Sequence, residues 1–187
     1  MEKICRVDGE KWRARLIGKI VQEASAEIMS HYLLDTNALN NLLDYVDASA
    51  LMPQMRGCIY VTHIQKDEIE NTKDFARRAS LLECLQEIGP DRWPTETFVL
   101  DRSRLGMARL GDNGPYAAIL TDLDRRKRKT NNPNDALIGE TAELHGAVLV
   151  SDDGDFADVM KSRGVRVVGW REFVSEMTTQ VAPDTPV

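Results

Sequence analysis

Short apolar runs of strand length alternate with segments of helical periodicity along most of this 187-residue chain. The expected strands are residues 31–35, 58–62, 97–101, 147–151 and 165–169. Four segments between them carry apolar side chains at helical spacing, namely 38–46, 64–88, 116–129 and 135–145. Gly89-Pro90 and His145-Gly146 are helix stop signals, and Asn134 has the composition of a helix N-cap. Because strands that alternate with helices form βαβ units, the sequence predicts an α/β fold with three layers (α/β/α) around a central parallel sheet.

Acidic residues recur where these apolar runs end. Asp35 closes the first run, Glu68 follows the second, Asp135 begins the helix 135–145, and Asp153 follows the run that ends in Ser151. The carboxyl ends of parallel strands lie along one edge of a sheet, where ligands bind, so we expect these side chains to meet. Like charges held together raise one another's pKa. Mg²⁺ or Mn²⁺, hard cations that prefer oxygen ligands, would offset this repulsion.

The turn Asp35-Thr36-Asn37 has two interpretations. It places a carboxylate at the edge of the sheet, with a hydroxyl and an amide beside it to orient it, but a simple helix N-cap has the same composition. The segment 152–155 is more specific, because three carboxylates crowd the end of a strand where a cap needs one. A solvated Asp/Gly turn is the alternative there.

Two acidic positions lie on expected helices. Of the acids near residue 68, we choose Glu68, because Ile64 lies one turn earlier on the same face and would dock that face on the sheet. Asp135 shares a helical stripe with Ile138 and Ala142, so its carboxylate stands at the N-terminal end of a buried face. An acidic residue near a helix start is also favoured by the helix dipole.

Composition limits the classes of protein that the chain can belong to. A net charge of −6 argues against a protein that coats nucleic acid, whose affinity comes mainly from lysine and arginine. No apolar stretch approaches the roughly 20 residues of a membrane span, and charged residues occupy the place of a signal peptide's apolar core. We therefore expect a cytoplasmic protein with no membrane contact. The three cysteines lack metal-ligand spacing, so we expect reduced thiols.

A basic run spans residues 125–129. Arg125, Lys127, Arg128 and Lys129 are the expected RNA-binding residues, because the run lies a short turn before Asp135 and would bring cations near the substrate strand. A run of like charge on a solvated helix face is the alternative.

The N-terminal segment differs in character from the alternating body. Residues 12–28 carry an amphipathic pattern that includes Trp12, Leu16 and Ile20. Such a stripe must be covered, because burying each large apolar side chain is worth about 1.5 to 3 kcal/mol. The cover would be the body, a second copy in a homodimer, or a partner protein. We expect an N-terminal helical extension at 1–28, a domain at 29–175 and a C-terminal tail at 176–187.

These residues, taken in order, resemble the PIN-domain family of metal-dependent ribonucleases, and toxin-like prokaryotic members in particular. The resemblance covers Tyr32 to about Val168, nearly the whole body. Its motifs are Leu33-Leu34-Asp35-Thr36-Asn37, Val61-Thr62 leading to Glu68, Asn134-Asp135-Ala136 with Ala142 and His145-Gly146, and Leu149-Val150-Ser151-x-Asp153-x-Asp155-Phe156. Each motif is short, and their joint order and spacing make the resemblance specific.

The resemblance implies a site and a reaction. Asp35, Glu68, Asp135 and Asp153 would be the catalytic and metal-binding acids, with Asp155 as an auxiliary metal ligand and Ser151 as an orienting hydroxyl. Mg²⁺ or Mn²⁺ would activate a water molecule that attacks phosphorus, so that the protein would be a metal-dependent endoribonuclease. The implied biology is the toxin of a toxin-antitoxin pair, with an antitoxin protein covering the site. A nuclease for single-stranded or structured DNA, and a non-catalytic RNA-binding or scaffold PIN domain, are the alternatives.

Overall fold

The computed structural model describes residues 30–111, 114–126 and 132–179. The chain divides into two units, Met1–Ser30 and His31–Val187, and every helix and strand named below belongs to the second. The expected amphipathic helix at 12–28 lies outside the described residues.

Five strands form one sheet in the second unit. They are β1 (Tyr32–Leu34), β2 (Ile59–Val61), β3 (Asp91–Arg92), β4 (Val148–Val150) and β5 (Val167–Val168). The order across the sheet is β3-β2-β1-β4-β5, and every neighbouring pair is parallel. Four of the strands fall within predicted ones, because their valine, leucine and isoleucine runs suit a sheet that is buried on both faces.

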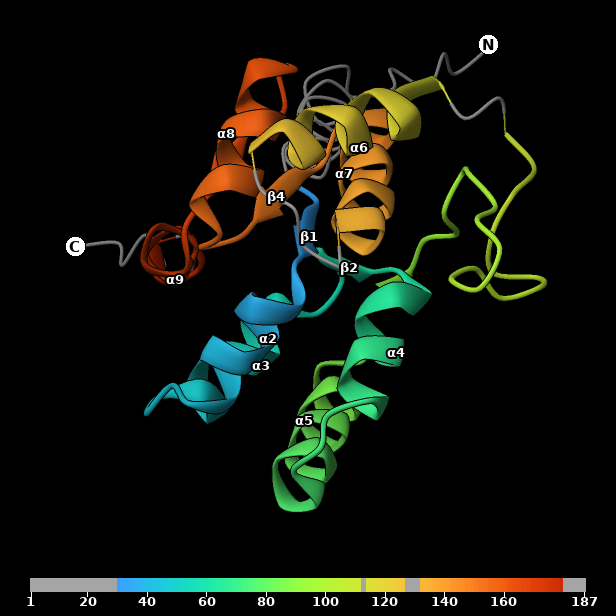
Figure 1. The fold of residues 1–187 in the computed structure, drawn as a ribbon. Coiled ribbons are helices and arrows are strands. Elements are labelled where there is room, and N and C mark those ends of the chain that lie inside the picture. The colour runs from blue at the N-terminus through green and yellow to red at the C-terminus, as the bar shows by residue number, and fades with distance from the viewer. Residues whose placement is uncertain (1–29, 112–113, 127–131, 180–187) are drawn as a thin grey trace, which may run out of the picture. The chain divides into compact units, whose positions relative to one another are not determined.

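Within the part of the chain that the structure describes, eight helices accompany the sheet (Figure 1). They are α2 (Thr36–Leu43), α3 (Ala48–Met55), α4 (His63–Glu70), α5 (Phe75–Ile88), α6 (Gly114–Arg126), α7 (Asn132–His145), α8 (Gly154–Ser162) and α9 (Trp170–Thr179). The predicted three-layer α/β fold is confirmed.

Two hydrophobic cores lie on opposite faces of the sheet. In β1, Tyr32 and Leu34 belong to one core and Leu33 to the other, as the alternation of side chains along a strand requires. The first core is completed mainly by α2, α3, α5 and α9, and the second by α6, α7 and α8. The helix α4 contributes to both, through Ile69 and Ile64 respectively. Packing on both faces therefore holds the ends of β1 and β4 in fixed positions.

The predicted helix at 64–88 is two helices. The first, α4, ends at Asn71, and the second, α5, begins after Asp74, whose side chain accepts a hydrogen bond from Arg77 N at 3.0 Å. Asn71 and Asp74 are good capping residues, so the polar stretch between them ends one helix and starts the next. The predicted stop at Gly89 is confirmed, because this residue has the left-handed backbone that glycine adopts readily (φ 58°).

The predicted strand at 97–101 is wrong. Thr97 N donates to Glu140 Oε2 at 3.1 Å, and Val99 N donates to the Ser103 hydroxyl at 3.0 Å, so this backbone bonds to side chains rather than to a strand. The edge strand beside β2 is β3, which is only two residues long. Leu100 is 80% exposed, and the apolar run that suggested a strand is a loop.

The start of one helix and the number of helices also differ from the sequence-based expectations. Asn134 lies inside α7, not at its cap, because the helix begins at Asn132 and Pro133 occupies its first turn, where proline's missing N–H is tolerated. The helices α3, α8 and α9 were not predicted. The last of these includes Met177, whose side chain is buried.

Among the residues described, no helix combines the length and the apolar character needed to cross a bilayer.

Leu33→Ala should lower the free energy of unfolding by about 2 to 5 kcal/mol, because Leu33 is fully buried where β1 meets the second core. Leu144→Ala, at a leucine that is 52% exposed on α7, is the matched control and should change stability by at most about 0.5 kcal/mol. Urea denaturation followed by circular dichroism measures both. Equal losses for the two variants would contradict the assignment of Leu33 to the core.

Candidate active site

The carboxyl ends of β1 and β4 form the base of the site. These strands are neighbours at the point where the strand order turns, with β2 and β3 on one side and β5 on the other, which is where open α/β sheets bind ligands. Asp35 follows β1 directly and its N–H donates to Val150 O at 3.0 Å, so the ladder continues to the acidic residue. Ser151 and Asp153 follow β4. The strand pairing itself thus brings residues far apart in sequence to one place.

A cavity of about 390 Å³ opens at this point. Its lining residues come from β1, α2, α4, α7, the start of α8 and the loop before α6, and they are Asp35, Thr36, Asn37, Glu68, Asn71, Arg102, Asn134, Asp135 and Asp153. All four acids expected to be catalytic line this cavity, as does Asn37.

Asp35 is the most deeply buried carboxylate of the site, with 4% of its surface exposed. Its pKa is raised from 3.8 to about 6, mainly by burial and to a smaller extent by the nearby charges of Glu68 and Asp153. Two hydrogen bonds oppose this shift, from the Ser151 hydroxyl to Oδ2 at 2.8 Å and from Thr36 N to Oδ1 at 2.7 Å. A cation at this position would lower the pKa again and favour the ionised form.

Glu68 lies on the face of α4 that looks into the cavity. Its Oε2 accepts a hydrogen bond from the Thr36 hydroxyl, and its Oε1 accepts one from Asn134 Nδ2 at 2.7 Å. Its acidic neighbours Asp67 and Glu70 instead form ion pairs with Arg104, at 2.6 and 2.9 Å. Both oxygens of Glu68 are therefore oriented by neutral donors, which fixes the carboxylate without neutralising it.

Asp135 and Asp153 stand at helix N-termini. Asp135 lies in the first turn of α7 and is 7% exposed. Asp153 is the N-cap of α8, where its Oδ1 accepts a hydrogen bond from Phe156 N at 3.1 Å. The positive ends of the two helix dipoles partly offset the negative charge of the site. Asp153 therefore caps a helix and lines the cavity at the same time.

Ser151 connects two of the acids. Its hydroxyl is buried, donates to Asp35 and accepts from Asp153 N at 3.2 Å. Asp155, the expected auxiliary ligand, is exposed in the first turn of α8 and is not among the lining residues.

The basic run is described only in part. Arg125 pairs with Asp122 at 3.3 Å, and Arg126 pairs with Asp158 on α8 at 2.9 Å, both on exposed surface. Lys127, Arg128 and Lys129 lie outside the described residues.

Sequence reasoning missed Asn71, which lines the cavity from the C-cap of α4, and two residues whose contacts place them in the site. Asn134, interpreted as a cap, is the amide that holds Glu68. Arg102 lines the cavity from the loop that was predicted to be a strand. An asparagine directly before an expected catalytic acid was the available signal for Asn134, whereas no local pattern marks Arg102.

The donor set suits a divalent ion of the magnesium type. Carboxylate oxygens are its preferred ligands, and a buried carboxylate with a raised pKa next to two other acids is a place where a cation is favoured. Within the described residues, no three acidic, histidine or cysteine side chains are already close enough to hold an ion together. Mg²⁺ commonly binds through one or two carboxylates and keeps several waters, so the site fits such an ion without a closed cage.

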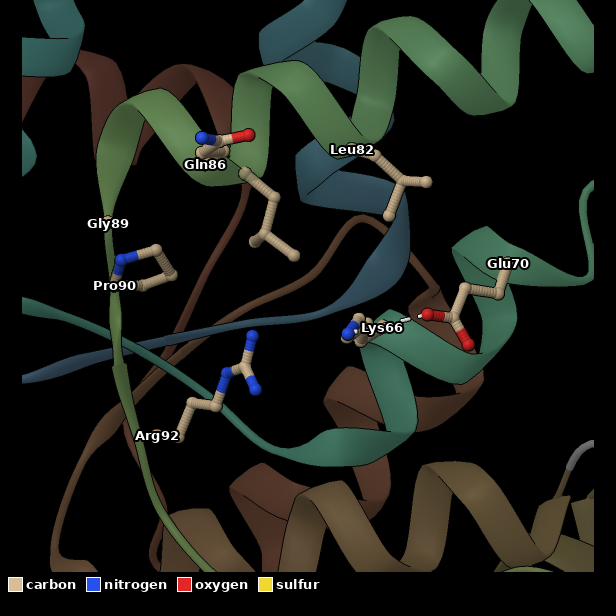
Figure 2. Close-up of a pocket in the computed structure, with 8 residues that line it drawn as sticks. Lys66, Glu70, Leu82, Gln86, Gly89, Pro90 and Arg92 are labelled. Carbon is tan, nitrogen blue, oxygen red and sulfur yellow. Dashed lines mark ion pairs between the residues drawn. The ribbon is translucent and has the colours of Figure 1, made fainter.

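A second cavity, of about 410 Å³, lies between α4, α5 and β3 (Figure 2). Its one acidic residue, Glu70, pairs with Lys66 at 3.4 Å, and Arg92 is also part of its wall. It lacks the converging carboxylates of the first cavity, which is therefore the better candidate for metal-dependent chemistry.

A model of the PIN domain family matches residues 32–161. Because this match spans most of the chain and includes the four acids of the cavity, the chain belongs to the PIN domain family. Members of this family are generally nucleases and usually use divalent metal ions. No curated protein matches the chain.

Two solved structures are similar to the chain. The crystal structure of PAE2754 from Pyrobaculum aerophilum has a TM-score of 0.51 at 15% sequence identity, over 82% of this chain and 98% of that one. The crystal structure of FitAcB from Neisseria gonorrhoeae has a TM-score of 0.40 at 17% identity, over 75% of this chain and 98% of that one. At 15% identity the likeness to PAE2754 shows a common fold only.

The raised pKa of Asp35 predicts a pH-dependent stability of the metal-free protein. Because the folded-state pKa of about 6 exceeds the ordinary 3.8, the stability linked to this group is full below pH 3.8 and is lost as the pH rises to about 6. Compared with Asp35→Asn, the wild-type free energy of unfolding should fall by roughly 2 to 3 kcal/mol between pH 4 and pH 7. Urea denaturation in EDTA measures this difference.

The control for this comparison is Leu144→Ala, at an exposed leucine, because this substitution removes no ionisable group. Its pH profile should run parallel to that of the wild type. A parallel profile for Asp35→Asn as well would contradict the assigned burial of a charged carboxylate.

Proposed function

We propose that this protein is a Mg²⁺- or Mn²⁺-dependent endoribonuclease. The observation that carries the proposal is the convergence of Asp35, Glu68, Asp135 and Asp153 on one cavity at the carboxyl edge of the sheet. Membership of a family of nucleases that usually use divalent ions supports it. RNA as the substrate and the identity of the ion are parts of the proposal.

In the proposed mechanism, Asp35, Asp135 and Asp153 would hold the ion. When bound, a divalent ion lowers the pKa of a water molecule and neutralises charge on the phosphate. Ser151 keeps Asp35 in place through its 2.8 Å hydrogen bond. Asn37, on the cavity wall, is proposed to orient the site as well.

Glu68 has a different role in this proposal, and Thr36 and Asn134 orient its carboxylate at the cavity wall. We assign it to the attacking water, either directly or through a second water, as the group that orients this water and accepts its proton. The leaving group is the 3′ oxygen of the RNA strand, so the products carry a 5′ phosphate and a 3′ hydroxyl. The basic residues Arg125, Lys127, Arg128 and Lys129 are proposed to contact flanking phosphates.

Purified protein should cut a mixed RNA pool in Mn²⁺ or Mg²⁺ and leave it intact in EDTA. Asp135→Asn should lower the rate at least about 100-fold, because removing a group that stabilises the transition state typically has an effect of this size. The variant should fold as well as the wild type, since asparagine is similar in shape and removes one of several like charges. A time course of cleavage with sequencing of the new ends measures the activity, and a thermal melt measures the folding of the variant.

A parallel arm of the same experiment uses single-stranded DNA, and Leu144→Ala serves as a folded, active control. Cleavage of DNA but not of RNA would show that the substrate is DNA and that the proposal of RNA is wrong. Absence of cleavage of either, together with a Tm that does not rise in millimolar Mn²⁺, would favour a non-catalytic PIN domain, because a ligand of the native state must stabilise it.

We further propose that the protein is the toxin of a toxin-antitoxin pair and acts in the cytoplasm, and that residues 12–28 contact the antitoxin or a second copy of the chain. This part rests on the resemblance to toxin-like members of the family. Induced expression of the wild type in a bacterial host without the partner should stop growth, and Asp135→Asn should not. Continued growth with wild-type protein present at the same level would contradict the toxin role.

A further inference from the structure

Arg102 is the one basic residue among the described residues that line the acidic cavity. Its Nη1 donates to Asn134 Oδ1 at 3.5 Å, and Asn134 in turn donates to Glu68 at 2.7 Å. The guanidinium thus lies beside the acidic residues and is linked to one of them through a single amide.

The loop that carries Arg102 is attached on two sides to the helices that carry the acids. On one side, Thr97 donates through both its N–H and its hydroxyl to Glu140 of α7, at 3.1 and 2.7 Å, and both residues are buried. On the other side, Arg104 pairs with Asp67 and Glu70 of α4. Arg102 lies between these two attachments. Its position relative to Glu68 on α4 and Asp135 on α7 is therefore set by tertiary contacts.

The backbone at Arg102 is also held in a specific turn. Arg102 N and Ser103 N both donate to Val99 O, at 3.2 and 2.8 Å. Asp101, directly before Arg102, has a left-handed backbone with φ 66°, the only such non-glycine residue among those described. This conformation is uncommon outside glycine, and such outliers persist where the surrounding contacts enforce them.

The positive charge of Arg102 would offset the repulsion between the acidic cavity and a phosphate group. Four carboxylates repel the phosphate that they must bring close to the ion, and a guanidinium presents a planar fork of donors that matches phosphate oxygens. We propose that Arg102 is a further catalytic residue, which binds the non-bridging oxygens of the scissile phosphate and stabilises the charge that develops on them. This inference rests on the proposed function for its substrate.

The other arginines of the same loop are engaged differently. Arg109 pairs with Glu96 at 2.9 Å, is 63% exposed at its side chain, and is not part of the cavity wall. It is therefore the matched control, because a substitution there removes the same charge from the same loop without touching the cavity.

The first test measures RNA binding without cleavage. On an Asp135→Asn background, the affinity for a fluorescein-labelled single-stranded RNA oligonucleotide is followed by anisotropy across a range of salt concentrations in Mg²⁺. Arg102→Gln should reduce the slope of log K against log salt by about 0.7, the value for one phosphate contact on a single strand. Arg109→Gln should leave the slope unchanged, and an equal reduction in both variants would overturn the assignment.

The second test uses single-turnover cleavage by the otherwise wild-type protein. Arg102→Gln should lower the rate about 100-fold or more, as loss of one donor to a developing oxyanion does, and Arg102→Lys should recover binding but only part of the rate. The rise in Tm with Mn²⁺ should stay as in the wild type. An unchanged rate would overturn the proposal, and so would a lost rate with a lost Mn²⁺ shift, because Arg102 would then act only by positioning Asn134 and Glu68.

The two proposals fail in distinguishable ways. If the wild type cuts no nucleic acid, the proposed endoribonuclease is wrong, whereas the binding comparison of Arg102→Gln with Arg109→Gln still decides whether Arg102 contacts phosphate. If the wild type cuts RNA and both Arg102 tests give wild-type values, only the inference on Arg102 is wrong.

Discussion

The parallel pairing of β1 with β4 is the constraint on which the site depends. It brings Asp35 beside Ser151, which are 116 positions apart in sequence, and lets one hydroxyl bond to the first acid and to the backbone of Asp153. Both strands are buried on their two faces, so neither can slide without exposing leucine and valine from one of the cores. Hydrophobic packing thus determines the position of the carboxylates. Their charge does not contribute to that packing.

In the metal-free protein, burial of the charged form of Asp35 is unfavourable. Desolvation raises the pKa of Asp35 to about 6, even though two hydrogen bonds to its oxygens act in the opposite direction. Glu68 is held by neutral donors, while Asp135 and Asp153 stand at the positive ends of helices. These contacts reduce the repulsion between the carboxylates. A site built in this way suits a cation, which would offset the repulsion between the carboxylates.

Four of the strands, and the meeting of the four acids at one cavity, could be predicted because both depend on local signals. Buried parallel strands are continuous apolar runs, and the acids follow those runs directly or lie one helical turn from a buried residue such as Ile64. Arg102 could not be predicted, because its loop is shaped by the distant contact of Thr97 with Glu140 rather than by its own residues. The segment 97–101 has the composition of a strand, but its backbone bonds to the side chains of Glu140 and Ser103. Asn134 was misassigned because a helix start and a partner for Glu68 require the same residue type.

The central claim is that the acidic cavity holds a divalent ion. Anomalous diffraction from crystals grown with Mn²⁺ tests it most directly, because the signal locates the metal without reference to activity. The account predicts a peak within coordinating distance of Asp35, with Asp135 or Asp153 as a further ligand. A protein saturated with Mn²⁺ whose peaks all lie outside the cavity, or a cavity that contains only water at millimolar Mn²⁺, would contradict the claim.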